Sequence, residues 1–189
     1  MLSLCPVKRL SLLCAALAAL CGCIERPWQD QPSAHPAIDR SRLAGVLVTA
    51  PPANLIPVGA IFGNAAELVG YTMEPRALVQ GERTRLTFYW RCLAELEPWH
   101  IFVHLDDANG SGERIHAEHE PAQGRYPTDA WLPGDLVADP IVFVPGRSPL
   151  FLFLGFYTQG DTRLPLTTPG RGRDDGQSRL LVGTLQIAR

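Results

Sequence analysis

Thr84–Cys92 has the sequence Thr-Arg-Leu-Thr-Phe-Tyr-Trp-Arg-Cys, and its strongly apolar positions recur at every second residue: Leu86, Phe88 and Trp90. The next run along the chain repeats this pattern with the apolar positions Ile101, Val103 and Leu105. A period of two places alternate side chains on opposite faces of a β-strand. The sequence therefore predicts two strands that each turn an apolar face towards a common core.

Similar short runs, separated by turn residues, continue along the chain. We expect strands near residues 67–73, 83–93, 99–106, 114–119, 136–144, 150–158 and 179–187. The separators include Asn109-Gly110, a dipeptide typical of tight hairpin turns because both residues tolerate positive φ. No window of a dozen residues has a clean period of 3.6, so no substantial helix is expected. This pattern predicts an all-β fold, a single antiparallel β-sandwich of the immunoglobulin or fibronectin kind with about seven strands.

The run from residue 150 to 156 is apolar almost throughout, which is typical of a central strand that is covered on both faces. Together with the alternating strands it predicts a sizeable core. We expect the interior of the sandwich to be wholly apolar and to contain no reactive group.

The N-terminal residues have the parts of a secretory signal. Lys8 and Arg9 are positively charged, and residues 10–20 form an apolar run that ends at Leu20-Cys21-Gly22-Cys23. The run is shorter than the roughly 20 residues that span a bilayer core, which disfavours a permanent transmembrane helix.

Leu20-Cys21-Gly22-Cys23 resembles the bacterial lipobox, which has an aliphatic residue at −3 and a small residue at −1 before the cysteine. The resemblance implies lipidation of Cys23, cleavage before it and anchorage to a membrane. Cys21 is a poorer acceptor because Leu20 would occupy its −1 position. Ile24 and Glu25 follow, where Asp would resemble an inner-membrane retention signal, and this favours the outer membrane. An ordinary cleaved signal with incidental cysteines is the alternative.

Three regions follow from these patterns: a signal peptide at residues 1–22, a lipidated and Pro/Ala-rich linker at residues 23–57, and a sandwich domain at residues 58–189. Few large apolar groups occur in the linker, which is typical of an extended spacer. Residues 43–49, Leu-Ala-Gly-Val-Leu-Val-Thr, are the exception. They form either a short strand that docks on the domain or an apolar patch within the linker.

The composition after cleavage excludes several kinds of chemistry. Lys8 is the only lysine, so a Schiff base or a lysine general base is excluded from the mature chain. Removing Lys8 and Arg9 from the 17 basic residues leaves 15 against 19 acids, a formal charge of −4. The arginines are dispersed, so no nucleic-acid surface is expected. Cys92 would be the one cysteine without lipid, and its place at the end of an apolar strand predicts a buried side chain and not a reactive thiol.

From Phe62 to Ile187 the order of motifs resembles a β-sandwich domain of bacterial exported proteins, often found as the non-membrane end of polytopic glycosyltransferase-like proteins. The matching pieces include Phe62-Gly63-Asn64, Leu86-Thr87-Phe88-Tyr89-Trp90, Ile101-Phe102-Val103-His104-Leu105, Gly124-Arg125-Tyr126-Pro127-Thr128, Trp131-Leu132-Pro133-Gly134, Asp139 and Gly155-Phe156-Tyr157. The resemblance implies a sandwich fold and a cell-envelope setting. It brings no activity, cofactor or catalytic residue.

His104 and His116 are the candidate metal ligands. A hairpin centred near Gly110 would place them opposite each other, where cross-strand Cβ atoms are about 4.5–5.5 Å apart. His119 would face the other way, opposite Ile101, and a third ligand, Asp106 or Glu118, would require a slipped or bulged register. The pattern favours a structural or surface histidine pair over a metal site.

Four aromatic residues are candidates for stacking on sugar rings: Trp99, Tyr126, Trp131 and Tyr157. The favoured alternative is that Tyr126 and Trp131 hold the crossover from Pro121 to Pro133 onto the core, since buried Trp and Tyr anchor loops well. The chain also lacks a Gly-x-Ser-x-Gly nucleophile motif.

The sequence thus predicts a membrane-anchored lipoprotein with a non-catalytic, accessory or binding sandwich in the cell envelope. We expect no enzymatic activity and no cofactor. The expected partners are the membrane, through the lipid anchor, and an envelope protein or a glycan, but no nucleic acid. The alternatives are a carbohydrate-binding module that uses exposed aromatics, and a metal-binding protein or metalloenzyme that uses His104 and His116.

Overall fold

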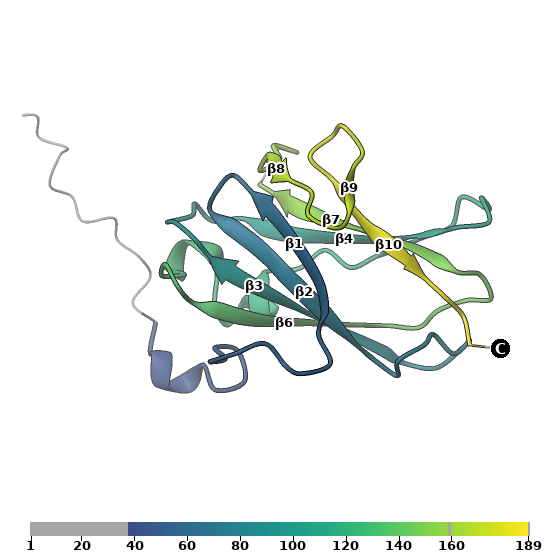
Figure 1. The fold of residues 1–189 in the computed structure, drawn as a ribbon, viewed down its shortest axis with the longest axis horizontal. Helices are drawn as coiled ribbons and strands as arrows, with labels where there is room; N and C mark the ends of the chain where they lie inside the picture. The colour runs from purple at the N-terminus through teal and green to yellow at the C-terminus, as the bar shows by residue number, and fades with distance from the viewer. Residues whose placement is uncertain (1–37, 159, 189) are drawn as a thin grey trace, which may run out of the picture. The chain divides into compact units, whose positions relative to one another are not determined.

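A computed structural model describes residues 38–158 and 160–188. The strands are β1 (Ile56–Phe62), β2 (Ala66–Glu74), β3 (Thr84–Cys92), β4 (His100–Asp107), β5 (Arg114–His116), β6 (Leu136–Phe143), β7 (Leu150–Tyr157), β8 (Leu166–Thr168), β9 (Arg173–Asp174) and β10 (Leu180–Leu185). Three short 3₁₀ turns accompany them: η1 (Arg40–Arg42), η2 (Pro121–Gly124) and η3 (Thr128–Ala130). Figure 1 shows the strands in two facing layers.

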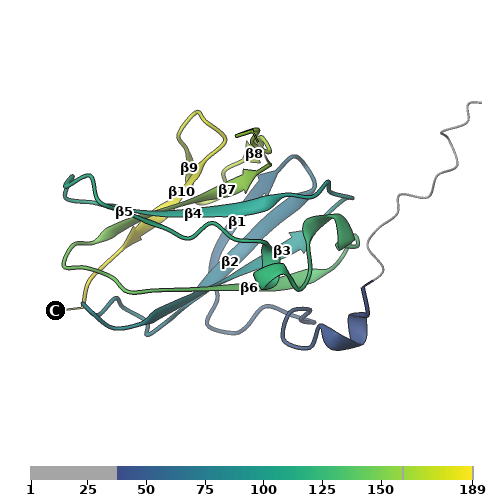
Figure 2. The ribbon, with the colours of Figure 1, turned by 180° about the vertical axis from the view of Figure 1, so that it is seen from behind.

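Both layers are five-stranded antiparallel sheets, in the orders β6-β3-β2-β1-β8 and β5-β4-β7-β10-β9. Seen from behind in Figure 2, β4 and β5 belong to one layer and β3 and β6 to the other. The prediction of an antiparallel β-sandwich is confirmed. All seven expected strands are present with ends that differ by a few residues, and β1, β8 and β9 were not predicted.

The core is organised around aromatic side chains from both sheets. Trp90 on β3 and Phe62 on β1 lie with ring centroids 6.0 Å apart. Phe156 on β7 contacts both, with its centroid 4.8 Å from that of Trp90 and 5.4 Å from that of Phe62. All three side chains are fully buried. Since they come from different layers, this cluster joins the two sheets by apolar burial and edge-to-face ring contacts.

The strand β7 corrects one expectation. Leu150, Leu152, Leu154 and Phe156 face the core, but Phe151 and Phe153 point to the other side and are only partly buried. The guanidinium carbon of Arg179 lies 4.0 Å from the Phe153 ring centroid. The apolar run therefore does not mark a strand covered by two layers, because a long arginine side chain covers part of the second face.

The expectation of a wholly apolar interior was also wrong. Asp139 on β6 has 0% of its surface exposed. Its carboxylate accepts hydrogen bonds from the His119 imidazole, with 2.9 Å between Nε2 and Oδ2, and from the Ala122 backbone N–H at 2.8 Å. A buried charged group is tolerated when such partners are present. This polar pair connects an edge strand of one sheet to the segment that follows β5 in the other.

The described part of the predicted linker packs against the sandwich. Leu43 and Val46 are buried in the core. The Val48 N–H donates to the Leu136 carbonyl at 3.0 Å, and the Ala138 N–H donates to the Val46 carbonyl at 2.7 Å. This pairing covers the free edge of β6, an arrangement that protects a sheet from edge-to-edge association. Residues 43–48 therefore dock on the domain, and the packed chain begins before residue 58.

Arg40 fixes the start of this docked segment. Its guanidinium donates to both carboxylate oxygens of Asp135, at 2.6 and 3.1 Å, and to the Tyr126 hydroxyl at 2.6 Å. Bidentate arginine–carboxylate pairs are stronger and more directional than single contacts. In the part of the chain that the structure describes, no helix has the length and apolar character needed to cross a membrane.

Candidate functional site

The sheet β5-β4-β7-β10-β9 has an outer face, turned away from the core, that carries the chemistry-bearing side chains. On β4, Ile101, Val103 and Leu105 are buried in the core, as the alternation predicted. The intervening residues of this strand lie on the outer face: His100, Phe102, His104 and Asp106. Alternation along one strand thus assigns the apolar set to stability and leaves the second set for a surface site.

Cross-strand pairing arranges these side chains in rows across the outer face. His104 pairs with His116 on one side and with Phe153 on the other. In the adjacent row Phe102 pairs with Gly155. A Cβ atom on Gly155 would lie 2.6 Å from the Phe102 ring. Glycine at position 155 therefore leaves room for this ring to lie against the sheet. The predicted opposition of His104 and His116 is confirmed.

His104, His116 and Glu118 form a compact cluster in this arrangement. Both histidines reach the same carboxylate oxygen: His104 Nε2 lies 3.0 Å and His116 Nδ1 lies 2.8 Å from Glu118 Oε1. The ring centroids of the two histidines are 5.1 Å apart and the rings are roughly perpendicular. Three ligand atoms, one from each residue, lie within 4.8 Å of one another.

The structure corrects the expectation about Glu118. The register is regular here, because the Ala117 N–H donates to the Val103 carbonyl and His119 bridges to Ile101. His119 faces the core side, as predicted. Glu118 lies two residues after His116 and therefore shares its face without any slip or bulge. The period of two would have identified this third residue. Asp106 instead forms a bidentate pair with Arg114, at 2.6 and 2.8 Å.

The environment shifts the protonation of the cluster. Burial lowers the pKa of His104 and outweighs the opposing effect of Glu118, so its imidazole is neutral near pH 7. Burial raises the pKa of Glu118, but hydrogen bonds from the neighbouring histidines outweigh this effect and lower it overall. The cluster therefore combines a carboxylate with at least one neutral imidazole.

A small cavity of about 130 Å³ adjoins this cluster and shares two of its residues. Its lining consists of Phe102, His104, Glu118, Tyr157, Asp161 and Arg163. The Arg163 guanidinium carbon lies 5.1 Å from the centroid of the Phe102 ring. Aromatic surface and groups of both charges thus meet within one hollow, which suits a ligand with an apolar face and polar edges.

The four predicted aromatic residues do not form one surface. Tyr126 and Trp131 have 0% of their surface exposed, so neither ring can stack on a ligand. The Trp131 indole donates to the Tyr126 carbonyl at 2.9 Å, which holds the crossover in place. Trp99 is partly buried against the core. Tyr157 alone of the four lines the cavity, and its ring centroid lies 5.4 Å from that of His100.

Among the described residues, His119 and Asp139 form the most buried ion pair, with side chains that are 15% and 0% exposed. Burial lowers the pKa of His119, but the hydrogen bond and the charge of Asp139 outweigh this effect and raise it overall. The Trp90 indole lies 3.4 Å from the same carboxylate. The adjacent residues Ala122 and Gln123 both have positive φ, of 52° and 59°. These contacts make the pair a structural connection between the sheets.

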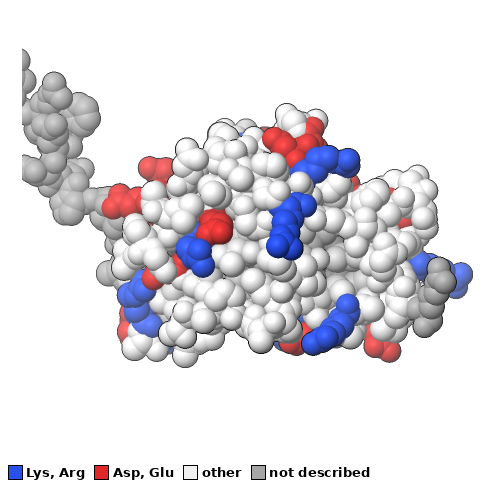
Figure 3. Space-filling model, in the orientation of Figure 1, with Lys and Arg blue, Asp and Glu red and all other residues white. Residues whose placement is uncertain are grey.

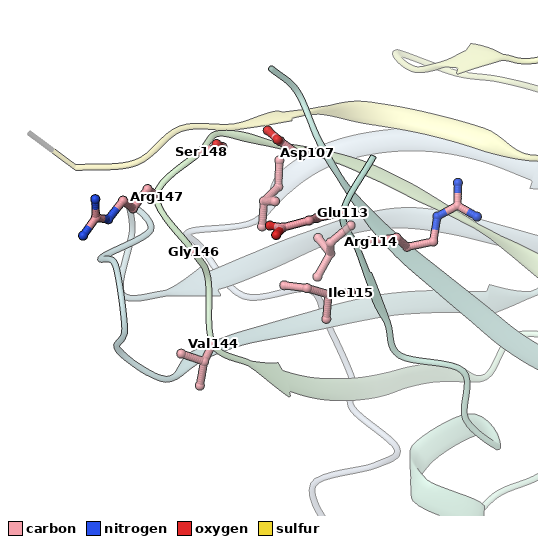
Figure 4. Close-up of a pocket in the computed structure, with 10 residues that line it drawn as sticks. Asp107, Glu113, Arg114, Ile115, Val144, Gly146, Arg147 and Ser148 are labelled. Carbon is pink, nitrogen blue, oxygen red and sulfur yellow. The ribbon is translucent and has the colours of Figure 1, made fainter. Parts of the chain in front are cut away.

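A larger cavity of about 420 Å³ lies at the other end of the sandwich (Figure 4), between the β4–β5 turn and the segment that joins β6 to β7. The guanidinium groups of Arg114 and Arg147 point away from the rest of the lining in this view. Asp107 accepts hydrogen bonds from the Asn109 and Ser111 N–H groups. A turn is present at Asn109-Gly110, but the connection spans residues 108–113, and of this pair only Gly110 has positive φ, at 82°. The Asp107 carboxylate is thus used within the turn, and the two arginines do not point towards it.

Cys92 is buried, as predicted. Burial raises the pKa of its thiol to about 11, so the thiolate is scarce at neutral pH. On the face shown in Figure 3, acidic and basic side chains form small separate groups of both signs. The Cys92 thiol is therefore a poor nucleophile. The face in Figure 3 has no continuous field of one charge.

No protein-family model matches the chain, and no curated protein matches it in sequence. Among solved structures, a match is the crystal structure of the C-terminal domain of Wzt, with a TM-score of 0.48 and 10% sequence identity. The superposition covers 73% of this chain and 83% of that chain. At this level of similarity no functional residue transfers to the present chain.

Proposed function

We propose that the chain is a bacterial lipoprotein whose sandwich domain is a non-catalytic binding module of the cell envelope, held by lipid on Cys23. The N-terminal motif Leu20-Cys21-Gly22-Cys23 supports the anchor. The outer face of the sheet β5-β4-β7 supports the binding role, because it places aromatic, cationic and carboxylate side chains around one cavity. The absence of Asp after Cys23 favours the outer membrane.

Lipidation is expected to depend on Cys23 alone among the N-terminal cysteines. In cells fed an alkyne-labelled palmitate, the wild-type protein should incorporate the label and fractionate with membranes. Cys23→Ala should abolish incorporation, because the Cys23 sulfur is the atom to which the diacylglyceryl group is attached. Cys21→Ala should retain it, and this variant is the matched control. Equal labelling of both variants would remove the basis for the anchor.

The number of primary amines in the mature protein provides a second test of lipidation. Lys8 would leave with the signal, so a mature protein with an acylated amino group would have no primary amine. An amine-reactive dye should therefore label the Cys23→Ala precursor but not the mature wild-type protein. Dye on one site of the mature protein would indicate a lipoprotein with a free N-terminal amine.

A glycan is the ligand class that the cavity favours. Sugars present apolar ring faces and polar hydroxyl edges, and the cavity offers the Tyr157 ring beside Arg163 and Asp161. Phe102 is only 3% exposed and lies under Arg163, so it contributes to the floor of the cavity. This assignment uses only Tyr157 of the aromatic residues that the sequence suggested.

Binding of isolated envelope polysaccharide to the full-length lipoprotein tests this assignment. Tyr157→Ala and Arg163→Ala should each weaken binding roughly tenfold, the equivalent of about 1.4 kcal/mol. Tyr89→Ala and Arg85→Ala are the matched controls, because both residues lie on β3 and project outward from the other sheet. The controls should bind as the wild type does. Equal losses in both pairs, or no binding by any protein, would contradict a glycan site in this cavity.

A further inference from the structure

His104, His116 and Glu118 meet at the edge of the outer face without a role in the core. His104 comes from β4, His116 from β5, and Glu118 from the extended residues that continue the pairing after β5. Their side chains differ in exposure, from 13% for His104 to 57% for His116. The cluster is therefore anchored on one side by the sheet and open to solvent on the other.

The distances within the cluster are close to those of a metal coordination sphere. Zn²⁺ binds histidine nitrogen and carboxylate oxygen at about 2.0–2.2 Å, so two ligands of a tetrahedral ion are about 3.3 Å apart. The observed separations from Glu118 Oε1 are 3.0 Å to His104 Nε2 and 2.8 Å to His116 Nδ1. All three ligand atoms lie within 4.8 Å of one another, so rotation of the exposed His116 side chain would bring the two histidine nitrogens to the separation that one ion requires.

Hydrogen bonding alone leaves the cluster incompletely satisfied. His104 Nδ1 is buried and has no hydrogen-bond partner among the described residues. Buried polar atoms without partners are few in folded proteins. This nitrogen lies on the opposite side of the imidazole from Nε2, so an ion held by Nε2 would not contact it, and the metal assignment rests on the geometry of the three ligand atoms. The three residues are therefore not optimised as a hydrogen-bonded network.

The donor set is selective for one class of ion. Two imidazoles and one carboxylate suit Zn²⁺, Cu²⁺ or Ni²⁺, whereas Mg²⁺ and Ca²⁺ prefer oxygen ligands throughout. Arg114 is paired with Asp106 at 2.6 Å, which offsets part of its repulsion towards a cation. Three protein ligands leave further coordination positions open, and the exposure of His116 provides an entry path.

We propose that His104, His116 and Glu118 bind a divalent transition metal ion, with Zn²⁺ as the probe, in a site that is open to solvent. The bound ion would place a positive centre beside the cavity that shares His104 and Glu118. This inference does not depend on the lipid anchor or on a glycan ligand.

Zn²⁺ titration of the full-length lipoprotein, without a polyhistidine tag, tests the site by calorimetry. The wild type should bind one Zn²⁺ per chain. His116→Gln and Glu118→Gln should each weaken binding at least about tenfold, since loss of even an outer partner of a metal ligand has an effect of 10–100-fold. Both residues are exposed, so these variants should fold.

His100→Gln is the matched control, because His100 lies on the same face of the same strand but contacts Tyr157 and not the cluster. It should bind Zn²⁺ as the wild type does, and a tenfold excess of Ca²⁺ should not compete. Undetectable Zn²⁺ binding by the wild type would overturn the proposal, as would equal affinities in the wild type, His116→Gln and Glu118→Gln. Palmitate labelling is unaffected by either result, so the two proposals fail separately.

Discussion

Replacing Asp139 with alanine is expected to lower the free energy of unfolding by about 3–5 kcal/mol, the usual effect of removing one partner of a buried charged pair. The carboxylate is fully buried and accepts hydrogen bonds from His119 and from the Ala122 N–H. The substitution would leave both donors in the interior without an acceptor. Such a loss is large compared with the total stability of about 5–15 kcal/mol for a typical domain.

Urea denaturation followed by circular dichroism measures this effect. Asp139→Asn should be less damaging than Asp139→Ala, because the amide oxygen retains one acceptor of similar position. Glu82→Ala, an exposed acid between β2 and β3, is the control and should change stability by no more than about 0.5 kcal/mol. A double-mutant cycle with His119→Gln should show that the two substitutions are not additive. Additive effects would mean that the pair has no energetic connection.

Replacing Trp131 with alanine is the second large effect that we expect, also about 3–5 kcal/mol, as for other fully buried tryptophans. The side chain has no exposed surface and its indole N–H bonds to the Tyr126 carbonyl. Its loss would both open a cavity and release the crossover that contains η2 and η3. Trp99→Ala is the comparison, because Trp99 is only partly buried, and it should cost less.

This pair of variants also separates the two roles that the sequence left open for Trp131. A residue that holds the crossover should lose stability in proportion to its burial, with polysaccharide binding affected only through unfolding. If Trp131→Ala kept the wild-type midpoint of urea denaturation and lost binding, Trp131 would be a ligand contact and its place in the core would be wrong.

Six of the seven strands that the sequence predicted are long enough to show a period of two. The seventh, β5, has only three residues but lies next to the Asn109-Gly110 turn signal. β3 and β4 alternate over eight or nine residues, and their faces were predicted correctly. β8 and β9 have three and two residues, too few for any period to appear. β1 contains Pro57 and Gly59 and shifts its register between Pro57 and Ala60, so its pattern resembled a linker.

The candidate site was predicted in part for the same reason. Strand pairing across a short turn can be predicted from the sequence, and this prediction correctly placed His104 opposite His116. Arg163 and Asp161 come from the segment after β7, and only the order of strands in the sheet brings them beside Phe102. The burial of Tyr126, its contact with Arg40 and the pairing of His119 with Asp139 depend on tertiary packing between distant segments, which no local pattern reports.

If Cys23 carries a lipid as proposed, the docking of the chain from Ile38 onward limits the distance between the domain and the membrane. A free chain as far as residue 57 could extend by about 115 Å, at a maximum near 3.4 Å per residue. With the chain fixed from Ile38 onward, only about 15 residue steps remain, a radius of about 50 Å. Such a domain would contact only those molecules of the periplasm or cell surface that lie close to its own bilayer. With the proposed anchor, any ligand would have to lie within about 50 Å of that bilayer for the domain to bind it.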